Sequence, residues 1–231
     1  MKSLQENEIN QAVIFDLDGL IINTEVAGYH IWLREFRRAG LEFDKKGYQQ
    51  LIGTHNLVGG YRPHEHLAAH LGNNVSAREL RKAVDLESIQ AIEQEGTMPG
   101  VLRILEEAKR KGIKLAVGSS SGRKWVHGHL QRLGIFDYFD TIVTSDDTEH
   151  AKPEPDIYLK VLENLNVAPE NALVLEDSYN GVLASHRAGI RVIAVPNEVT
   201  TGQDFSLATA ILPSLEALNL AEYFPNYQLA E

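Results

Sequence analysis

Residues 12–19 of the chain read Ala-Val-Ile-Phe-Asp-Leu-Asp-Gly, and this stretch decides how the rest of the sequence is interpreted. The four apolar residues Ala12–Phe15 are typical of a short buried strand. Asp16 and Asp18 follow directly, and Gly19 after them also favours a turn. Two carboxylates this close together repel each other unless a cation or a proton neutralises them. The stretch therefore predicts either a tight turn or a site for a positively charged ligand at the end of a strand.

Four later apolar runs also have the length of a buried strand, and turn or polar residues bound each of them. These runs are residues 113–117, 141–144, 172–175 and 191–195. Helix-length segments lie before or between them, at 100–110, 122–133, 155–165 and 180–188, and residues 208–212 and 215–224 suggest a last strand and a last helix. Strands that alternate with helices form a parallel sheet that is covered on both faces. The sequence therefore predicts an α/β fold with a Rossmann-like parallel sheet.

The segment between the first strand and Gly100 breaks this alternation. It is about 80 residues long, far longer than an ordinary loop, and contains no convincing strand. Three parts of it have helical patterns, at residues 26–39, 62–71 and 77–95. We therefore expect an inserted α-helical cap domain at residues 24–96. The core domain would then consist of residues 1–23 and 97–231.

Composition excludes several classes of protein. The 22 Lys and Arg residues stand against 32 Asp and Glu residues, and the formal net charge of −10 disfavours nucleic acid as a partner. The absence of cysteine excludes disulfides, thiolate nucleophiles and cysteine-ligated metals. No apolar run is long enough to span a membrane, and residues 1–11 lack the pattern of a secretory signal. We expect a cytoplasmic protein that binds neither nucleic acid nor a membrane.

Three further strand ends carry polar residues. Ser119, Ser120 and Ser121 follow the second strand, Lys152 follows the third, and Glu176 and Asp177 follow the fourth. Each has an ordinary explanation, such as a helix cap for a serine or a solvated surface position for a lysine. The carboxyl ends of parallel strands, however, meet at one edge of the sheet. The full set predicts a site where Mg²⁺ and a lysine neutralise carboxylates and a phosphoryl group, because only hard oxygen ligands are available.

These four strand ends resemble the motifs of the haloacid dehalogenase superfamily, in the branch of β-phosphoglucomutase-like and phosphoglycolate phosphatase-like enzymes with an inserted helical cap. Asp16-Leu17-Asp18-Gly19 resembles the first motif of that family, Ser119 the second, Lys152 the third and Glu176-Asp177 the fourth. The resemblance extends from about residue 12 to about residue 218. It also includes residues 124–130, which are similar to a bacterial subgroup of hydrolases.

The resemblance implies a two-step phosphoryl transfer. Asp16 would attack phosphorus and form an aspartyl-phosphate, while Asp18 would act as general acid and then as general base. Mg²⁺ would be held by Asp16, Asp177 and the backbone carbonyl of Asp18, with Glu176 nearby or as a further ligand. Ser119, Ser120 and Lys152 would bind phosphoryl oxygens. The expected partner is a small phosphorylated metabolite, and the expected assembly is a monomer or a weak homodimer.

Candidate contacts to the substrate lie at the cap entrance and in the cap. They are Thr24, Glu25, His55, Asn56 and Arg62, together with Arg123 after the serines. The mutases of this branch have a histidine four residues after the entrance threonine, where this chain has Gly28, and His30 would lie on another side of a helix. We therefore expect hydrolysis of a sugar phosphate or similar ester. A β-phosphoglucomutase-type reaction is the alternative.

A receiver-type signalling domain is a second alternative, since it also places acidic residues, a hydroxyl and a lysine on a parallel sheet without being an enzyme. In a receiver the acceptor aspartate follows the third strand and the lysine comes last. Here the Asp16/Asp18 pair comes first, and Lys152 precedes the second acidic pair. A receiver also has no helical insertion. This order of residues favours the hydrolase.

Overall fold

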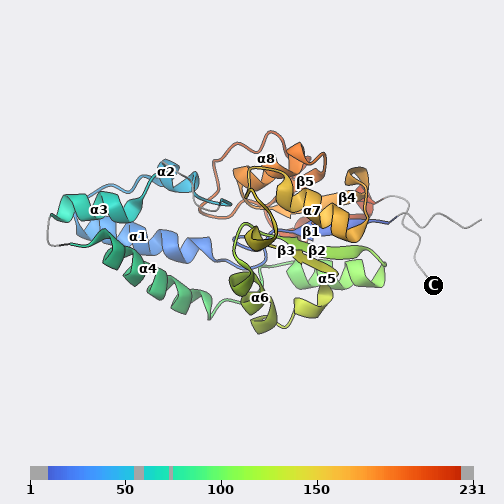
Figure 1. The fold of residues 1–231 in the computed structure, drawn as a ribbon, viewed down its shortest axis with the longest axis horizontal. Helices are drawn as coiled ribbons and strands as arrows, with labels where there is room; N and C mark the ends of the chain where they lie inside the picture. Colours follow the sequence, from blue (N-terminus) through green and yellow to red (C-terminus); the bar gives the residue numbers. More distant parts are fainter. Residues whose placement is uncertain (1–9, 55–59, 73–74, 225–231) are drawn as a thin grey trace, which may run out of the picture.

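The computed structural model of the chain describes residues 10–54, 60–72 and 75–224. One sheet of parallel strands has the order β3-β2-β1-β4-β5-β6 (Figure 1). The strands are β1 (Ala12–Phe15), β2 (Lys114–Gly118), β3 (Thr141–Val143), β4 (Ala172–Glu176), β5 (Arg191–Ala194) and β6 (Ala210–Ile211). The α/β fold with a Rossmann-like sheet is thus confirmed.

Helices cover both faces of the sheet, and alternate residues of each strand point to opposite faces. They are α5 (Val101–Arg110), α6 (Arg123–Arg132), α7 (Asp156–Leu165), α8 (Tyr179–Arg187) and α9 (Leu220–Tyr223). Val13 and Phe15 of β1 pack in one apolar cluster with α5 and α6. Ala12 and Ile14 pack in the other cluster with α7 and α8. All four residues of β1 are fully buried, so β1 is the centre of the core.

Short 3₁₀ turns and one interrupted helix complete this part of the chain. The 3₁₀ turns are η1 (Phe136–Tyr138), η2 (Ser145–Asp147), η3 (Pro169–Asn171) and η4 (Leu215–Ala217). The helix expected at 215–224 is wrong as a single element, because η4 ends before Asn219 and α9 begins after it. The Asn219 side chain accepts a hydrogen bond from the backbone N–H of Ala221, so it caps a new helix instead of continuing the old one.

Four helices between β1 and α5 lie beside the carboxyl ends of the strands (Figure 1). They are α1 (Glu25–Arg38), α2 (Lys45–Gln49), α3 (Pro63–Leu71) and α4 (Ala77–Ile92). Residues from α1, α3 and α4 form an apolar cluster of their own, which includes Trp32, Phe36 and Leu67. The helix α2 is absent from the sequence prediction because its five residues include a glycine and are too few for a helical pattern.

Hydrogen bonds connect this helical segment to the sheet region at one side. Ser120 Oγ donates to the carbonyl oxygen of Gly53 over 2.9 Å, and Asn180 Nδ2 donates to that of Ile52 over 2.8 Å. Gln49 Nε2 also donates to the carbonyl oxygen of Val199 over 2.7 Å. The segment from α2 to Thr54 is therefore attached to the loops that follow β2 and β5 and to the first turn of α8.

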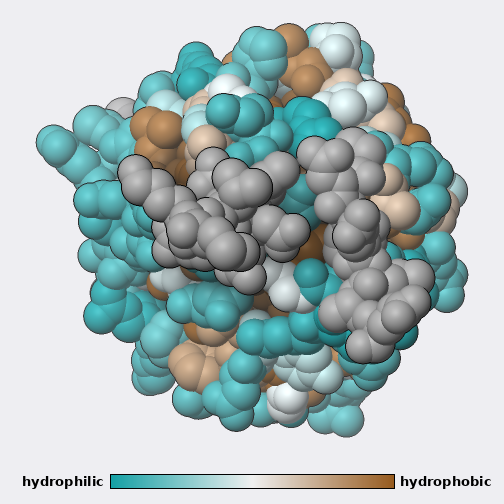
Figure 2. Space-filling model, turned by 90° about the vertical axis from the view of Figure 1, so that its right-hand side faces the viewer, coloured by the Kyte–Doolittle hydropathy of each residue, from teal (hydrophilic) through white to brown (hydrophobic). Residues whose placement is uncertain are grey.

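The face of the molecule opposite the helical segment is mainly polar (Figure 2). Viewed from the end opposite the helical segment, the visible face is largely hydrophilic with scattered apolar residues (Figure 2). Within the described ranges, every helix is too short or too polar to cross a membrane.

Candidate active site

The register between the two central strands determines where the acidic residues lie. Phe15 of β1 pairs with Leu175 of β4, and the backbone N–H of Asp16 donates to the carbonyl oxygen of Leu175 over 3.0 Å. Asp16 therefore lies beside Glu176 and Asp177. The strands that follow β1 in the chain lie first on one side of it, as β2 and β3, and then on the other side, as β4 to β6. Ligands of open parallel sheets bind at such a switch point.

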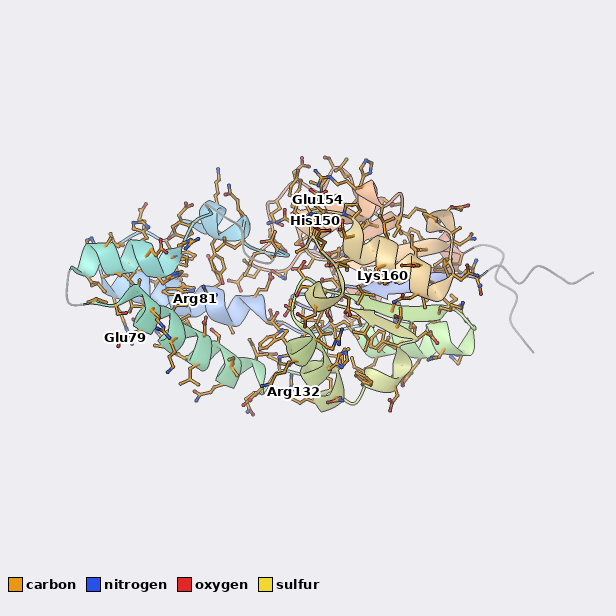
Figure 3. All side chains as sticks on the ribbon, viewed as in Figure 1. Glu79, Arg81, Arg132, His150, Glu154 and Lys160 are labelled. Atoms are coloured by element: carbon orange, nitrogen blue, oxygen red, sulfur yellow. The ribbon has the colours of Figure 1, made fainter. Side chains whose placement is uncertain are left out.

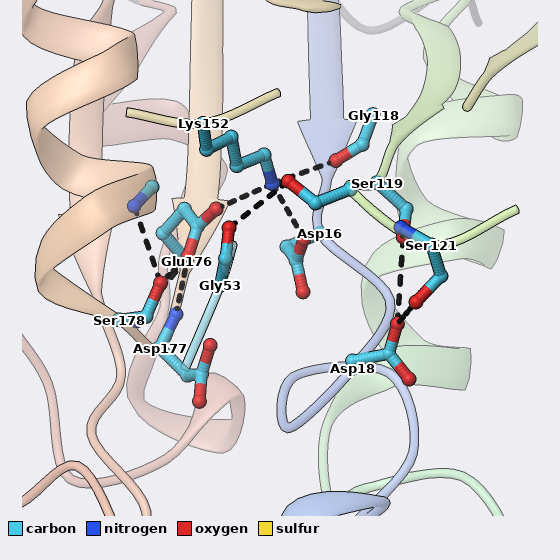
Figure 4. A network of polar contacts seen from close by, with 12 residues as sticks. Asp16, Asp18, Gly53, Gly118, Ser119, Ser121, Lys152, Glu176, Asp177 and Ser178 are labelled. Carbon is cyan, nitrogen blue, oxygen red and sulfur yellow. Dashed lines mark hydrogen bonds and ion pairs between the residues drawn. The ribbon is translucent and has the colours of Figure 1, made fainter. Parts of the chain in front are cut away.

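Lys152 lies in the middle of this group (Figure 4). Its Nζ donates to Asp16 Oδ1 over 2.5 Å, to Glu176 Oε1 over 2.7 Å and to the carbonyl oxygen of Gly118 over 2.9 Å. The side chain is fully buried, so this is not the solvated lysine of the ordinary explanation. Burial alone would lower the pKa of Lys152, but attraction by Asp16 and Glu176 outweighs it and the pKa is raised. Lys152 therefore remains positively charged.

Both carboxylate oxygens of Glu176 are occupied by protein donors. Oε1 accepts from Lys152 and from the hydroxyl of Tyr158 over 2.7 Å. Oε2 accepts from the backbone N–H groups of Asp177 and Ser178 and from Ser178 Oγ. A carboxylate with this many partners positions Lys152 and the start of α8, and it has little capacity left for direct metal coordination.

Asp177 points toward the loop that follows β1. Its Oδ2 accepts from Asn197 Nδ2 over 2.7 Å, and Asn197 Nδ2 lies 3.4 Å from the carbonyl oxygen of Gly19. An added Cβ at Gly19 would stand 2.3 Å from Asp177 Oδ2, and Gly19 has a φ of +88°. Only glycine allows the loop after Asp18 to approach Asp177 this closely.

Three buried carboxylates form a group that could surround a metal ion, and Asp16 and Asp177 are its candidates for direct coordination. Asp16, Glu176 and Asp177 each offer an oxygen, and these oxygens lie within 4.8 Å of one another. Burial, opposed by Lys152 and reinforced by Glu176, raises the pKa of Asp16, and burial with Glu176 and Asp16 raises the pKa of Asp177. Three carboxylates face one lysine, so the group lacks about two positive charges when all are ionised. Their hard oxygen atoms and this charge deficit fit Mg²⁺.

Asp18 lies apart from that group, beside the serines that follow β2 (Figure 4). Its Oδ2 accepts from Ser121 Oγ over 2.6 Å and from Ser119 Oγ over 3.4 Å, and its Oδ1 accepts from Trp125 Nε1 over 2.8 Å. The Asp18 side chain is absent from the metal-competent group of the described residues. The structure therefore does not place the Asp18 side chain with these three carboxylates, and the metal role of its backbone carbonyl stays a prediction.

The serines after β2 have different partners. Ser119 is buried, and its Oγ accepts from the backbone N–H of Ser121 over 3.0 Å as well as contacting Asp18. Ser120 Oγ donates instead to the carbonyl oxygen of Gly53. Ser119 is thus placed at the pocket beside Asp18, whereas the hydroxyl of Ser120 joins the core to the helical segment.

A cavity of about 480 Å³ lies over these residues. Asp16, Asp18 and Ser119 form its floor, and α1 and α4 contribute its walls with Thr24, Glu25 and other residues. Glu25 Oε2 and Thr24 Oγ1 are buried and have no hydrogen-bond partner among the described residues. Burial, and then repulsion by Asp177, Asp18, Asp16 and Glu176, raises the pKa of Glu25. The two entrance residues are therefore placed where a ligand would satisfy them.

The remaining candidates are not brought to this floor. His55 and Asn56 lie outside the described residues. Arg62 lines a second cavity in the helical segment and pairs with Glu65 over 3.0 Å. The Arg123 guanidinium pairs with Asp147 instead of facing the cavity, and its backbone N–H donates to Asp146 Oδ2. The Arg123 guanidinium is thus directed to Asp147, and its contact with phosphate stays a prediction.

Three residues that contact the acidic groups are absent from the sequence prediction. Trp125 is not among the predicted site residues, but its indole N–H donates to Asp18. Tyr158 donates to Glu176 and Asn197 to Asp177. Their distance in sequence from the residues they contact hides these roles. For Trp125, its place in the first turn of the helix that follows the serines is the one feature of the sequence that could have indicated a position near the site.

Known proteins are similar to this chain in sequence and in fold. The family described as haloacid dehalogenase-like hydrolase matches residues 13–195. Over 211 residues, the chain is 38% identical to "Putative phosphatase YhcW" of Bacillus subtilis (strain 168), which covers 91% of this chain and 94% of that protein. It is 35% identical over 214 residues to "Phosphorylated carbohydrates phosphatase" of Thermotoga maritima, with 91% and 97% covered.

A solved structure agrees with these relatives. The crystal structure described as "putative beta-phosphoglucomutase from Thermotoga maritima" has a TM-score of 0.72 and 32% sequence identity, with 92% of this chain and 98% of that chain covered. The expected resemblance is confirmed, and it excludes the receiver-type alternative. This chain belongs to the haloacid dehalogenase-like hydrolase family.

Proposed function

We propose that this protein is a Mg²⁺-dependent phosphatase that hydrolyses a small phosphorylated metabolite, a sugar phosphate or a similar ester. The observation that carries this proposal is the buried group of Asp16, Lys152, Glu176 and Asp177, of which Asp16 lines a cavity of about 480 Å³. We also propose that residues 1–23 and 97–231 act as the core domain and residues 24–96 as the cap domain. The separate apolar cluster of the cap helices supports this division.

The reaction proceeds in two steps in this proposal. A carboxylate oxygen of Asp16 bonds to phosphorus while the bond from phosphorus to the leaving oxygen breaks, and Asp18 donates a proton to that oxygen. Asp18 then takes a proton from water, the water oxygen bonds to phosphorus, and the bond to Asp16 breaks to release inorganic phosphate. Lys152 and Ser119 stabilise phosphoryl oxygens by charge and hydrogen bonding.

Asp16, Asp177 and the backbone carbonyl of Asp18 would hold Mg²⁺, with Glu176 behind them. When bound, the ion would offset the negative charge that accumulates between the carboxylates and the phosphoryl group. Glu176 keeps Lys152 in place through the 2.7 Å contact, and Asn197 keeps Asp177 in place in the same way. The protein thus supplies a rigid set of oxygen atoms for the cation.

Hydrolysis is favoured over phosphosugar mutation by the surroundings of Gly28. An added Cβ at Gly28 would lie 3.3 Å from the hydroxyl of Tyr48 and 3.5 Å from Ser88 Oγ, so two hydroxyl groups occupy the space beside it. His30 is turned elsewhere and lies 3.1 Å from Glu198 on the surface. No imidazole of the described residues lines the cavity over Asp16. Water, and not a second sugar hydroxyl, is therefore the proposed acceptor.

The cavity walls favour a leaving group rich in hydroxyls. Ser88 Oγ donates to the carbonyl oxygen of Val84 over 2.7 Å, so its lone pairs remain available to a ligand. Glu25 and Asp85 add carboxyl groups to the same cavity. A hydroxyl both donates and accepts, so it satisfies Glu25 in either protonation state, whereas a second anionic group would be repelled. The proposed substrates are phosphate monoesters whose sugar or polyol part carries no charge.

Phosphate release from a set of esters tests the proposal. With Mg²⁺, we expect turnover of neutral sugar or polyol phosphates in preference to phosphoglycolate, and EDTA should stop it. Asp16→Asn should abolish turnover while the protein stays folded. Asp137→Asn serves as the control, because Asp137 is exposed on η1. Activity of Asp16→Asn near that of the wild type would refute the assignment of the nucleophile.

A second assay separates hydrolysis from mutation. Glucose 1-phosphate is supplied with Mg²⁺ and a hexose bisphosphate as primer, and both inorganic phosphate and glucose 6-phosphate are measured over time. We expect inorganic phosphate as the product. Glucose 6-phosphate that forms faster than free phosphate would instead establish the mutase reaction.

A further inference from the structure

The general acid/base is held by a single continuous segment of the chain. All three donors to the Asp18 carboxylate, from Ser119, Ser121 and Trp125, lie between the end of β2 and the first turns of α6. Trp125 is the one donor among them that belongs to a helix. Through Trp125, the Asp18 carboxylate is thus linked directly to α6.

The donor that Trp125 supplies differs in kind from the two hydroxyls. An indole N–H cannot accept a hydrogen bond, and it cannot rotate independently of its ring as a hydroxyl does. When Ser119 turns to a phosphoryl oxygen, as proposed, Asp18 keeps only Ser121 and Trp125. The 2.8 Å contact from Trp125 is then the one with a fixed direction.

The Trp125 ring is itself held by neighbours on one face of α6. Its centroid lies 4.2 Å from that of the His129 ring, in an edge-to-face arrangement at 73°. Burial, and then Arg132, lowers the pKa of His129, so its ring is neutral near pH 7 and Nδ1 can accept from Arg132 Nη2 over 3.4 Å. Trp125, His129 and Arg132 are spaced i, i+4 and i+7 and so share a face of the helix.

Arg132 fixes the other end of this face to the cap. Its Nη1 donates to the carbonyl oxygens of Glu93 and Glu95 over 3.1 Å and 2.8 Å, and its Nη2 donates to that of Ile92 over 3.2 Å. These are the last carbonyls of α4 and of the turn after it, where the chain returns to the core (Figure 3). The face of α6 thus connects the Asp18 carboxylate to the return of the cap.

We propose that Trp125 is a positioning residue for Asp18: its indole N–H, anchored through His129 and Arg132, holds the carboxylate where it protonates the leaving oxygen. This inference rests on the proposed phosphatase function. It assigns Trp125 no contact with the phosphoryl group. Loss of the N–H should impair proton donation more than it impairs phosphate binding.

Leaving groups of different basicity test this role. An alkyl phosphate, such as glycerol phosphate or the best sugar phosphate, needs a proton on its leaving oxygen, whereas p-nitrophenolate leaves without one. Pre-steady-state rates of the first step are measured for both esters with the wild type and with Trp125→Phe, which keeps an aromatic ring. We expect the decrease for the alkyl ester to exceed that for p-nitrophenyl phosphate by about 10-fold or more, with a smaller change in KM, because general acid catalysis contributes about 10²- to 10⁴-fold.

The outcomes separate the two proposals. A wild type that releases phosphate from neither ester would refute the proposed function and this inference with it. An active wild type whose Trp125→Phe variant loses the same factor with both esters, or loses nothing, would overturn the positioning role alone.

Fluorescence tests the contact even if Trp125→Phe fails to fold. The chain contains two tryptophans, so Trp32→Phe leaves Trp125 as the only one. In that background, Asp18→Ala should shift the emission of Trp125, because the partner of the indole N–H is removed. Asp16→Ala is the matched control and should leave the emission in place. An unchanged emission in the Asp18→Ala variant would show that the contact does not exist in solution.

Discussion

Glu176 is the residue on which the charged groups of the pocket depend. It is fully buried, yet it accepts hydrogen bonds from Lys152, Tyr158, Ser178 and the backbone of Asp177. A buried carboxylate is costly unless such donors compensate its lost hydration. Its contribution is therefore to hold Lys152 and the start of α8 in a fixed geometry, and the loss of its charge should affect stability as well as catalysis.

Glu176→Gln should destabilise the protein by about 3 kcal/mol, because it leaves a buried lysine with only part of its compensation. The matched control is Glu163→Gln, since Glu163 pairs with Lys160 over a similar 2.7 Å but its side chain is 70% exposed. That change should stay within about 0.5 kcal/mol. Urea denaturation measures both, and equal losses would contradict the structural role of Glu176.

At the residue scale, the sequence predicted the groups that strand ends bring together. Asp16, Lys152, Glu176 and Asp177 were predicted because parallel strands end at one edge of the sheet. Trp125, Tyr158 and Asn197 were not, because a partner across the fold leaves no pattern in the chain. Arg123 was placed at the phosphate from proximity in sequence to the serines, but η2 offers Asp147 as a closer partner.

At the scale of elements, the start of α8 requires glycine at position 181, because there is no room for a side chain. Gly181 packs so closely on the end of β4 that an added Cβ would stand 1.7 Å from Glu176 Oε1. The backbone N–H of Gly181 also donates to Ser178 Oγ over 3.2 Å, which caps the helix. The glycine lets the first turn of α8 reach the buried carboxylate.

Gly181→Ala should therefore lower the free energy of unfolding by about 1–3 kcal/mol, because a well-packed site must expand to admit the methyl group. The matched control is Gly128→Ala on α6, where an added Cβ would meet nothing within 4 Å. That change should raise stability by about 0.5–1 kcal/mol, since alanine favours a helix. Thermal and urea unfolding of both variants check the opposite signs. A Gly181→Ala protein as stable as the wild type would show that α8 can move away from Glu176.

The elements that the sequence predicted are those whose periodicity is long enough to recognise. The five strands from β1 to β5 and helices such as α5, which buries Val101, Ile104, Leu105 and Ala108, have clear patterns. The expected strand at 208–212 shrinks to β6, only two residues long. The helix α2 was missed because its five residues are stabilised by neighbours, with Asp44 accepting from the backbone N–H of Gly47 over 2.9 Å.

At the scale of the whole molecule, the protein carries a net negative charge, and part of it lies on the buried carboxylates of the pocket. The formal net charge is −10, and the pKa values of Asp16 and Asp177 are raised chiefly by burial. The folded state therefore binds protons more tightly at these groups than the unfolded chain does. Without a cation, their contribution to stability is greatest below the ordinary carboxyl pKa of about 4 and is lost as pH rises through the raised values.

Mg²⁺ should reverse this loss, because it binds the ionised carboxylates. We expect the Tm increase caused by MgCl₂ to grow from pH 5 to pH 8. When Mg²⁺ is at about 100 times its Kd, the added free energy of unfolding should be about 2.7 kcal/mol. Thermal unfolding with MgCl₂ or with EDTA at each pH measures the difference. Asp177→Asn should reduce both the metal effect and its pH dependence. A metal effect independent of pH would contradict binding at these carboxylates.

The central place of β1 also affects how the chain can assemble during synthesis. The strand leaves the ribosome before the other strands of the sheet, and its two neighbours begin only at Lys114 and Ala172. At ordinary translation rates, the most hydrophobic strand of the protein waits on the order of ten seconds for its second neighbour. The intervening helices emerge in that interval, so the nascent chain has to keep β1 from aggregating until the sheet can close around it.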